Sequence, residues 1–133
     1  MTSGSLDTNV LLRLLLNDIP DQHNAVKGLL TESTGQFSIA DTAIIELVFA
    51  LRRYYDFTRQ QVTEAVTGLV QLREINCNRI LFERALSTYL EHPALSFEDA
   101  CLAMYATLNN AEPLWTFDKK LANQVSSAEF VTA

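Results

Sequence analysis

The chain has 133 residues, of which 48% are hydrophobic and 20% are charged, and its formal net charge is −6. This length and balance predict a single globular domain over residues 1–133, and 4 Gly and 3 Pro are too few for long linkers or disorder. The acidic balance counts against a large sequence-independent nucleic-acid footprint, and no apolar run or signal-peptide pattern indicates a membrane partner.

Short apolar strands are expected to alternate with helices along the chain. In the first half, the expected elements are a brief strand ending at Leu6, helices over about 9–16 and 20–31, a strand over 36–40, and helices over about 42–54 and 58–72. In the second half, they are a short strand near Ile75, helices over about 78–91 and 96–110, a strand over 114–117, a short helix from Asp118 and an edge strand over 129–132. This alternation predicts an α/β fold, a three-layer sandwich with a mostly parallel central sheet of about five short strands flanked by helices.

Capping and burial can also be predicted for particular residues. Asp41 is expected to cap the helix that begins there, and Thr58 and Gln61 have the form of a capping box. The strand over 114–117 is expected to be buried. The helix over 20–31 is expected to bury an apolar stripe made of Ala25, Val26, Leu29 and Leu30.

The cysteines and histidines form no metal-ligand motif. Cys77 and Cys101 belong to no CxxC or Cys/His cluster, so we expect two buried thiols in a reducing cytosol and a cytoplasmic localisation. His23 and His92 stand far apart in loop-like or helix-end settings, and both are expected at the surface. A zinc site is therefore not expected.

Four acidic residues stand where surface charge explains them poorly. Each lies beside residues that are expected to be buried, and the four are Asp7, Glu46, Asp99 and Asp118. Carboxylates are seldom buried unless they are paired or bind a metal, and four together need a cation to stay ionised. Hard oxygen ligands of high negative charge select Mg²⁺ or Mn²⁺. The pattern predicts a divalent-metal nuclease site in which these four residues are catalytic and bind the metal.

The expected topology can bring these acids to one rim, because functional groups in parallel sheets collect beyond the carboxyl ends of the strands. Asp7 and Asp118 each follow an expected strand directly, whereas Glu46 and Asp99 lie near the starts of helices. Each acid also has a structural explanation. Three could serve in helix caps, and Glu46 could share a solvated stripe with Arg53, seven residues later. Taken together on one rim, the four favour a site.

Basic residues gather in two short groups, Arg52, Arg53 and Arg59, and Lys119 with Lys120. Contact with phosphate would explain both groups. An exposed helix face explains them equally well, and the sequence leaves both readings open.

Four segments of the chain resemble the PIN domain family, and in particular the toxin nucleases of bacterial VapBC-type toxin–antitoxin pairs. The segments are Leu6 to Leu12, Ile45 to Leu47, Ser96 to Ala100 and Leu114 to Leu121. They occur in the family's order with family-like spacing, and the resemblance spans essentially the whole chain. The resemblance implies a PIN-like fold and a Mg²⁺- or Mn²⁺-dependent endoribonuclease, a hydrolase that cleaves single-stranded or structured RNA.

The same resemblance implies roles for individual residues. The family's acidic positions are matched by Asp7, Glu46, Asp99 and Asp118. Polar positions that would support the ligands by hydrogen bonding are matched by Thr8, Asn9 and Thr116. Asp118 is implied to contact the metal less strictly, frequently through water.

The resemblance further implies a toxin of a type II toxin–antitoxin system, with a homodimer and a small antitoxin protein as partners. Helices near 11–16 and 44–51 are apolar almost all round, and they offer surface for either partner. The start of the chain departs from the family, because Thr2 to Ser5 are polar where apolar strand residues are usual. Either the first strand is short or residues 1–5 differ from the native start.

Two other functions are considered beside the nuclease. One is a catalytically silent PIN-like binding module, in which the acids are structural. The other is a phosphoacceptor, receiver-like domain, which needs a central aspartate and a late lysine at a strand end. Lys119 follows Asp118 at the start of a helix instead, which places this second alternative further behind.

Overall fold

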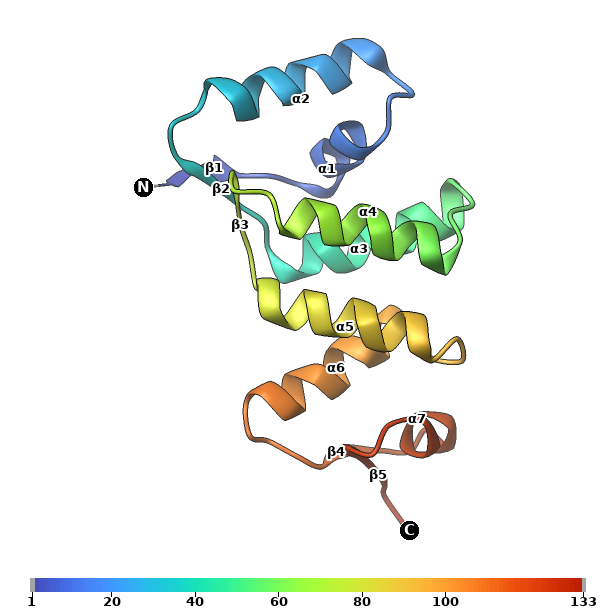
Figure 1. The fold of residues 1–133 in the computed structure, drawn as a ribbon. Helices are drawn as coiled ribbons and strands as arrows, with labels where there is room; N and C mark the ends of the chain where they lie inside the picture. Colours follow the sequence, from blue (N-terminus) through green and yellow to red (C-terminus); the bar gives the residue numbers. More distant parts are fainter. Residues whose placement is uncertain (1, 133) are drawn as a thin grey trace. The chain divides into compact units, whose positions relative to one another are not determined.

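The computed structural model describes residues 2–132, and the chain divides into two compact units, Met1–Arg79 and Ile80–Ala133 (Figure 1). The described residues form seven helices and five strands, and every strand pairing is parallel. Parallel neighbours need crossover connections, and the helices supply them. The two units are described in turn.

The first unit is a parallel sheet with four helices. Its elements are β1 (Thr2–Ser5), α1 (Thr8–Leu15), α2 (Pro20–Glu32), β2 (Gln36–Ser38), α3 (Asp41–Tyr54), α4 (Arg59–Val70) and β3 (Ile75–Asn76). The strands lie in the order β1-β2-β3, with Ser5 opposite Ser38 and Phe37 opposite Ile75. Because β1 and β2 are parallel, α1 and α3 both begin beyond the same edge of this sheet.

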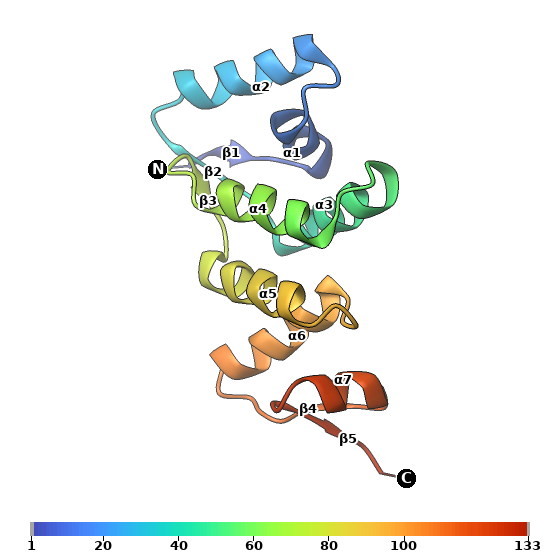
Figure 2. The same ribbon diagram turned by 45° about the vertical axis from the view of Figure 1, so that its right-hand side comes forward.

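Helices α3 and α4 supply much of the first unit's buried surface, and they lie side by side in both Figure 1 and Figure 2. Apolar residues recur at helical spacing on α3 and α4, and the fully buried ones include Ile44, Leu47, Leu51, Val62 and Val66. The capping box predicted at the start of α4 is confirmed, because Thr58 and Gln61 exchange both of its hydrogen bonds. Helix α1 packs against both α2 and α3.

The second unit contains the remaining five elements. They are α5 (Arg79–Glu91), α6 (Phe97–Leu108), β4 (Leu114–Thr116), α7 (Lys119–Gln124) and β5 (Ala128–Phe130). The two strands pair in parallel, with Trp115 opposite Glu129. One apolar cluster ties α6, α7 and β5 together, and it consists of Leu95, Ala103, Leu121, Val125 and Ala128 with Leu114 packed against it.

The predicted α/β, PIN-like architecture is confirmed, with five short parallel strands among helices. The strands are not joined in a single ladder in the described residues, since they form a three-stranded and a two-stranded sheet. β4 and β5 are three residues long and pair with each other within the second unit. The polar β1 is short and exposed, in keeping with a short first strand. The single domain over residues 1–133 stays a prediction.

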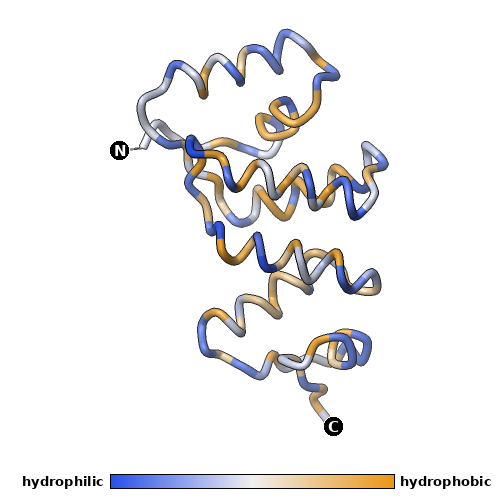
Figure 3. Tube along the Cα trace, in the orientation of Figure 1, coloured by the Kyte–Doolittle hydropathy of each residue, from blue (hydrophilic) through white to orange (hydrophobic). Residues whose placement is uncertain are grey.

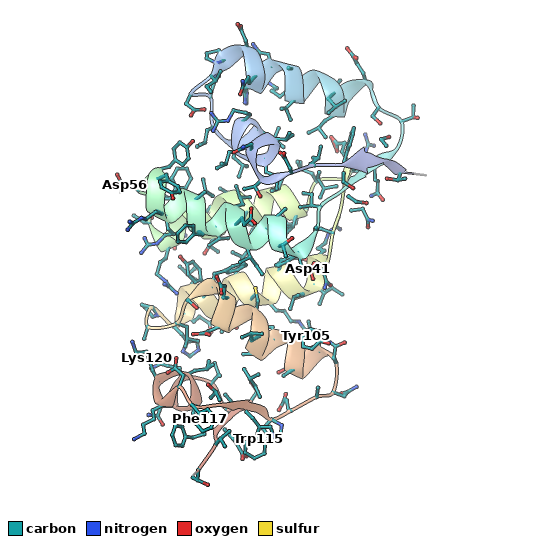
Figure 4. The ribbon with its side chains drawn as sticks, turned by 180° about the vertical axis from the view of Figure 1, so that it is seen from behind. Asp41, Asp56, Tyr105, Trp115, Phe117 and Lys120 are labelled. Atoms are coloured by element: carbon teal, nitrogen blue, oxygen red, sulfur yellow. The ribbon has the colours of Figure 1, made fainter. Side chains whose placement is uncertain are left out.

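Two burial predictions are wrong. Ala25 and Leu29 of α2 are exposed, Leu29 to 48%, because the packed stripe of α2 is narrow and contains only Val26 and Leu30. The segment 114–117 is not a buried strand, since Trp115 is 60% and Phe117 is 73% exposed, and both extend from the β4 segment in Figure 4. A two-stranded sheet packed on one face turns alternate side chains outward.

Figure 3 colours much of α1 as hydrophobic, and within this helix Leu11 and Leu12 are buried whereas Val10 and Leu14 are half-buried. The capping prediction for Asp41 is wrong, because Ala40 occupies the N-cap of α3 and Asp41 is the first helical residue. Cys101 is buried as predicted, whereas Cys77 is half-buried. No helix within residues 2–132 has the length and hydropathy to cross a bilayer.

Candidate active site

Asp7 lies two residues beyond β1 and forms the N-cap of α1. Its Oδ1 atom accepts a hydrogen bond from the backbone N–H of Val10 at 3.0 Å. The structural explanation of this residue as a helix cap is therefore confirmed. The side chain is nevertheless exposed, and it lines a pocket at the end of the β1–β2 ladder. Capping holds the carboxylate in one orientation, which suits a residue that must also present its charge to a ligand.

Glu46 lies one turn inside α3, and its side chain is exposed. The Thr8 hydroxyl lies 3.1 Å from Glu46 Oε2 and 3.4 Å from the carbonyl oxygen of Ala43, and it can donate to either acceptor. This contact joins the first turn of α1 to α3. Because β1 and β2 are parallel neighbours, Asp7 and Glu46 both lie beyond the carboxyl ends of their strands, where the sequence predicted them.

The two acids share a pocket of about 480 Å³, here named the acid pocket. Its lining residues are Asp7, Thr8, Asn9, Leu12, Glu46, Phe49, Ala50, Tyr54 and Tyr55. The described lining contains two carboxylates and no lysine, arginine or histidine, so nothing in it neutralises their charge. Carboxylate, hydroxyl and amide oxygens are the hard donors that Mg²⁺ and Mn²⁺ prefer, and the donor set fits such an ion.

A hydrogen-bonded group supports one wall of the acid pocket. Arg13 donates from Nη2 to the hydroxyl of Tyr55 at 2.9 Å and from Nη1 to both oxygens of Asp18 at 3.0 Å. The hydrogen bond to Tyr55 is the largest cause of a raised pKa at Arg13, with Asp18 adding to it and desolvation opposing it. The carbonyl oxygen of Arg13 also lies 2.9 Å from His23 Nδ1. Arg13 therefore holds the Tyr55 side chain in place, a role that no sequence pattern indicated.

Asp99 lies in the first turn of α6, in the second unit, and its side chain is half-buried. Its backbone N–H donates to Ser96 Oγ at 3.1 Å, so Ser96 is the N-cap of α6. The first turn also contains Glu98, whose side chain is exposed, unlike the half-buried side chain of Asp99.

Asp118 is the N-cap of α7. Its Oδ1 atom accepts from the backbone N–H groups of Lys120 at 2.9 Å and Leu121 at 3.1 Å. Thr116 Oγ1 accepts from the backbone N–H of Asp118 at 2.9 Å, which fixes the turn between β4 and α7. The ammonium group of Lys119 lies 5.6 Å from the centre of the Phe130 ring. Asp118 therefore has a confirmed structural role, and a metal role stays a prediction.

The structure thus brings Asp7, Thr8, Asn9 and Glu46 together in the first unit and joins Thr116 to Asp118 in the second. In neither unit do residues 2–132 bring together three His, Cys, Asp or Glu side chains as ligands of one ion. Phe49, Tyr54 and Tyr55 also line the acid pocket, and they were not predicted as site residues. Their signal was a group of aromatic residues around the end of an otherwise apolar helix.

The protein family of this chain follows from a match over most of its length. The PIN domain family matches residues 5–125, which include all four predicted acids and parts of both units. The chain belongs to the PIN domain family. PIN domains are in general nucleases, acting on nucleic acid and usually depending on a divalent metal. No curated protein matches this PIN domain.

The contact between Thr8 and Glu46 leads to a first prediction for this PIN domain. Thr8→Val keeps the shape of the side chain but removes the hydroxyl that lies 3.1 Å from Glu46. If Glu46 holds a metal ion, we expect nuclease activity to fall about 10- to 100-fold, because loss of a hydrogen bond that orients a metal ligand typically has this effect. Thr8→Ser keeps the hydroxyl and is expected to retain most of the rate. Equal rates for Thr8→Val and the unchanged protein in a timed cleavage assay would contradict this positioning role.

Proposed function

We propose that this PIN domain is a Mg²⁺- or Mn²⁺-dependent endoribonuclease. The observation that carries the proposal is the pairing of Asp7 and Glu46 in one pocket that contains no basic side chain among its described lining residues. Two uncompensated carboxylates attract a cation, and a cation in turn attracts the phosphate of a nucleic acid. Membership of a nuclease family makes phosphodiester hydrolysis the reaction that best fits this arrangement.

Within the acid pocket, Asp7 and Glu46 are the residues proposed to hold the metal. Magnesium is commonly held through one or two carboxylates while it keeps several waters, and two acids suffice for such a site. When bound, the cation supplies the positive charge and Lewis acidity that phosphodiester hydrolysis requires. The hydrogen bond from Val10 orients Asp7, Thr8 orients Glu46, and the amide of Asn9 adds a polar group for water or substrate.

Asp99 and Asp118 are proposed as further catalytic acids, and their support is their match to the family's acidic positions. Asp118 accepts two backbone hydrogen bonds through Oδ1, which agrees with a weaker, water-mediated contact with metal. Thr116 is proposed to support Asp118 through the turn that it fixes. We further propose that the whole chain acts as one domain, because the family match runs across both units.

The test of this activity is cleavage of a labelled single-stranded RNA by the purified protein. We expect cleavage with Mg²⁺ or Mn²⁺ and none after chelation, and activity should return when metal is added back. Cleavage that persists in chelator would contradict the metal requirement. Binding of RNA without cleavage would favour the silent module, whereas metal-dependent labelling by acetyl phosphate would favour the phosphoacceptor.

We also propose that the nuclease is the toxin of a type II toxin–antitoxin pair in the cytoplasm, acting as a homodimer and held by a small antitoxin. The resemblance in four ordered segments supports this role. Exposed apolar side chains offer surface for such partners, among them Ile19, Ile80 and Leu102. Induced expression is expected to arrest growth, and the Asp7→Asn variant is expected to relieve the arrest. Unimpaired growth with the active protein would exclude the toxin role and leave the nuclease intact.

A further inference from the structure

Two aromatic side chains at the acid pocket are more exposed than their chemistry favours. Phe49 is 58% exposed and Tyr54 is 70% exposed, although both lie on α3, whose opposite face is fully buried. Their rings are 6.2 Å apart between centroids and nearly perpendicular, at 87°. An edge-to-face pair holds each ring in place while leaving ring faces available. Both rings line the same pocket as Asp7 and Glu46.

A second pocket adjoins the first at Phe49. It has a volume of about 440 Å³, here named the arginine pocket, and is lined by Phe49, Arg52, Arg53, Asp56 and Phe57. Two arginines face one aspartate there, so the lining has a formal charge of +1. Arg52 donates through Nη1 to the carbonyl oxygen of Phe57 at 2.9 Å, which orients its guanidinium. Asp56, at the far end of α3 from Asp41 in Figure 4, has a φ of 55°, and it turns the chain back toward α4.

One face of α3 therefore presents an acid, an aromatic ring and a base in that order. Glu46, Phe49 and Arg53 are related by i, i+3 and i+7, and the rise of a helix separates the first from the last by roughly 10 Å. A single-stranded nucleic acid can occupy such a face, because it alternates phosphates with bases that have open π-faces. One phosphate can pair with Arg53, whereas a phosphate beside Glu46 requires the proposed cation between them.

We propose that Phe49 and Tyr54 form a stacking site for an unpaired RNA base beside the scissile phosphate, and that Arg52 and Arg53 bind the adjoining phosphate. This inference rests on the proposed function, because it adds a base-binding site to the same pocket. A paired base is already stacked within a duplex and cannot offer its face to these rings. The site accordingly selects loops and unpaired ends over helical RNA.

The test is RNA binding by the full chain in chelator, where cleavage does not occur, measured by fluorescence anisotropy. The probes are a labelled single-stranded oligonucleotide, the same strand with abasic riboses, and its duplex. We expect the unchanged protein to bind the complete strand about 5- to 150-fold more tightly than the abasic strand, as stacking on one aromatic side chain provides. Phe49→Ala is expected to bind both strands alike, whereas Phe49→Trp keeps the preference.

Leu29→Ala is the matched control, because Leu29 is an exposed apolar residue of the same unit outside both pockets. It should leave binding unchanged. The stacking site would be overturned by full preference for bases in Phe49→Ala or by no RNA binding at all. It would also be overturned if the unchanged protein bound the abasic strand or the duplex as tightly as the complete strand. A changed oligomeric state in Phe49→Ala with unchanged RNA binding would assign the aromatic pair to a protein interface instead. Metal-dependent cleavage alongside any of these results would leave the proposed nuclease standing.

Discussion

Asp7→Asn is expected to reduce metal-dependent RNA cleavage by at least about 100-fold without unfolding the protein. The side-chain oxygen of asparagine can still accept the hydrogen bond from Val10, and asparagine is as good an N-cap as aspartate. The substitution therefore removes the negative charge and leaves the helix start intact. Loss of a partner that only orients a ligand lowers metal affinity or activity about 10- to 100-fold, so loss of a ligand should have at least that effect.

The matched control for this substitution is Asp41→Asn. Asp41 is also an exposed acid in the first unit, at the first turn of α3, and it does not line the acid pocket (Figure 4). We expect its rate of cleavage to equal that of the unchanged protein. Rates are measured under single-turnover conditions, with thermal melting followed by circular dichroism. Equal cleavage by Asp7→Asn would show that the activity does not depend on this carboxylate.

Asp99→Asn is expected to have a comparably large effect, a loss of at least about 100-fold in the same assay, if Asp99 is a catalytic acid as we propose. The substitution keeps the size of the side chain and leaves the backbone N–H that donates to Ser96 Oγ in place. Helix α6 should therefore start at the same residue. A loss of rate with an unchanged melting temperature would assign the effect to chemistry.

Glu98→Gln separates the role of Asp99 from the general charge at the start of α6. Both acids lie in the first turn of α6, where a negative side chain interacts favourably with the helix dipole. Glu98 is exposed, whereas Asp99 is half-buried. Full activity is expected for Glu98→Gln. A similar loss in both variants would point to the charge of the helix start, and no loss in Asp99→Asn would remove it from the catalytic residues.

Local patterns predicted much of the fold because each depends on a few neighbouring residues. The capping box at Thr58 and the Ser96 cap follow from side chains three residues from their partners, and both are present. The order of elements in the sequence predicted that Asp7 follows the first strand. It also predicted that Glu46 lies in the helix after the second strand, which is α3. Their meeting required only that β1 and β2 be parallel neighbours.

Burial was harder to predict, because it depends on what packs against an element. Leu29 and Phe117 have the residue types of a core, yet both are exposed, even though Phe117 contacts the ring of Phe130 edge-to-face. The exposure of Phe49 and Tyr54 was missed for the same reason. Arg13 was equally unpredictable, as its contact with Tyr55 joins residues 42 positions apart. The part of the site that the sequence missed therefore consists of contacts between helices.

The most direct test of the account is the binding of Mn²⁺ to the purified full chain, followed by electron paramagnetic resonance as free Mn²⁺ is consumed. Saturable binding is expected for the unchanged protein and for Asp41→Asn. Asp7→Asn and Glu46→Gln should each bind at least about tenfold more weakly, because each removes one carboxylate from the acid pocket. Binding that is absent in the unchanged protein, or undiminished in both pocket variants, would contradict a metal site at Asp7 and Glu46.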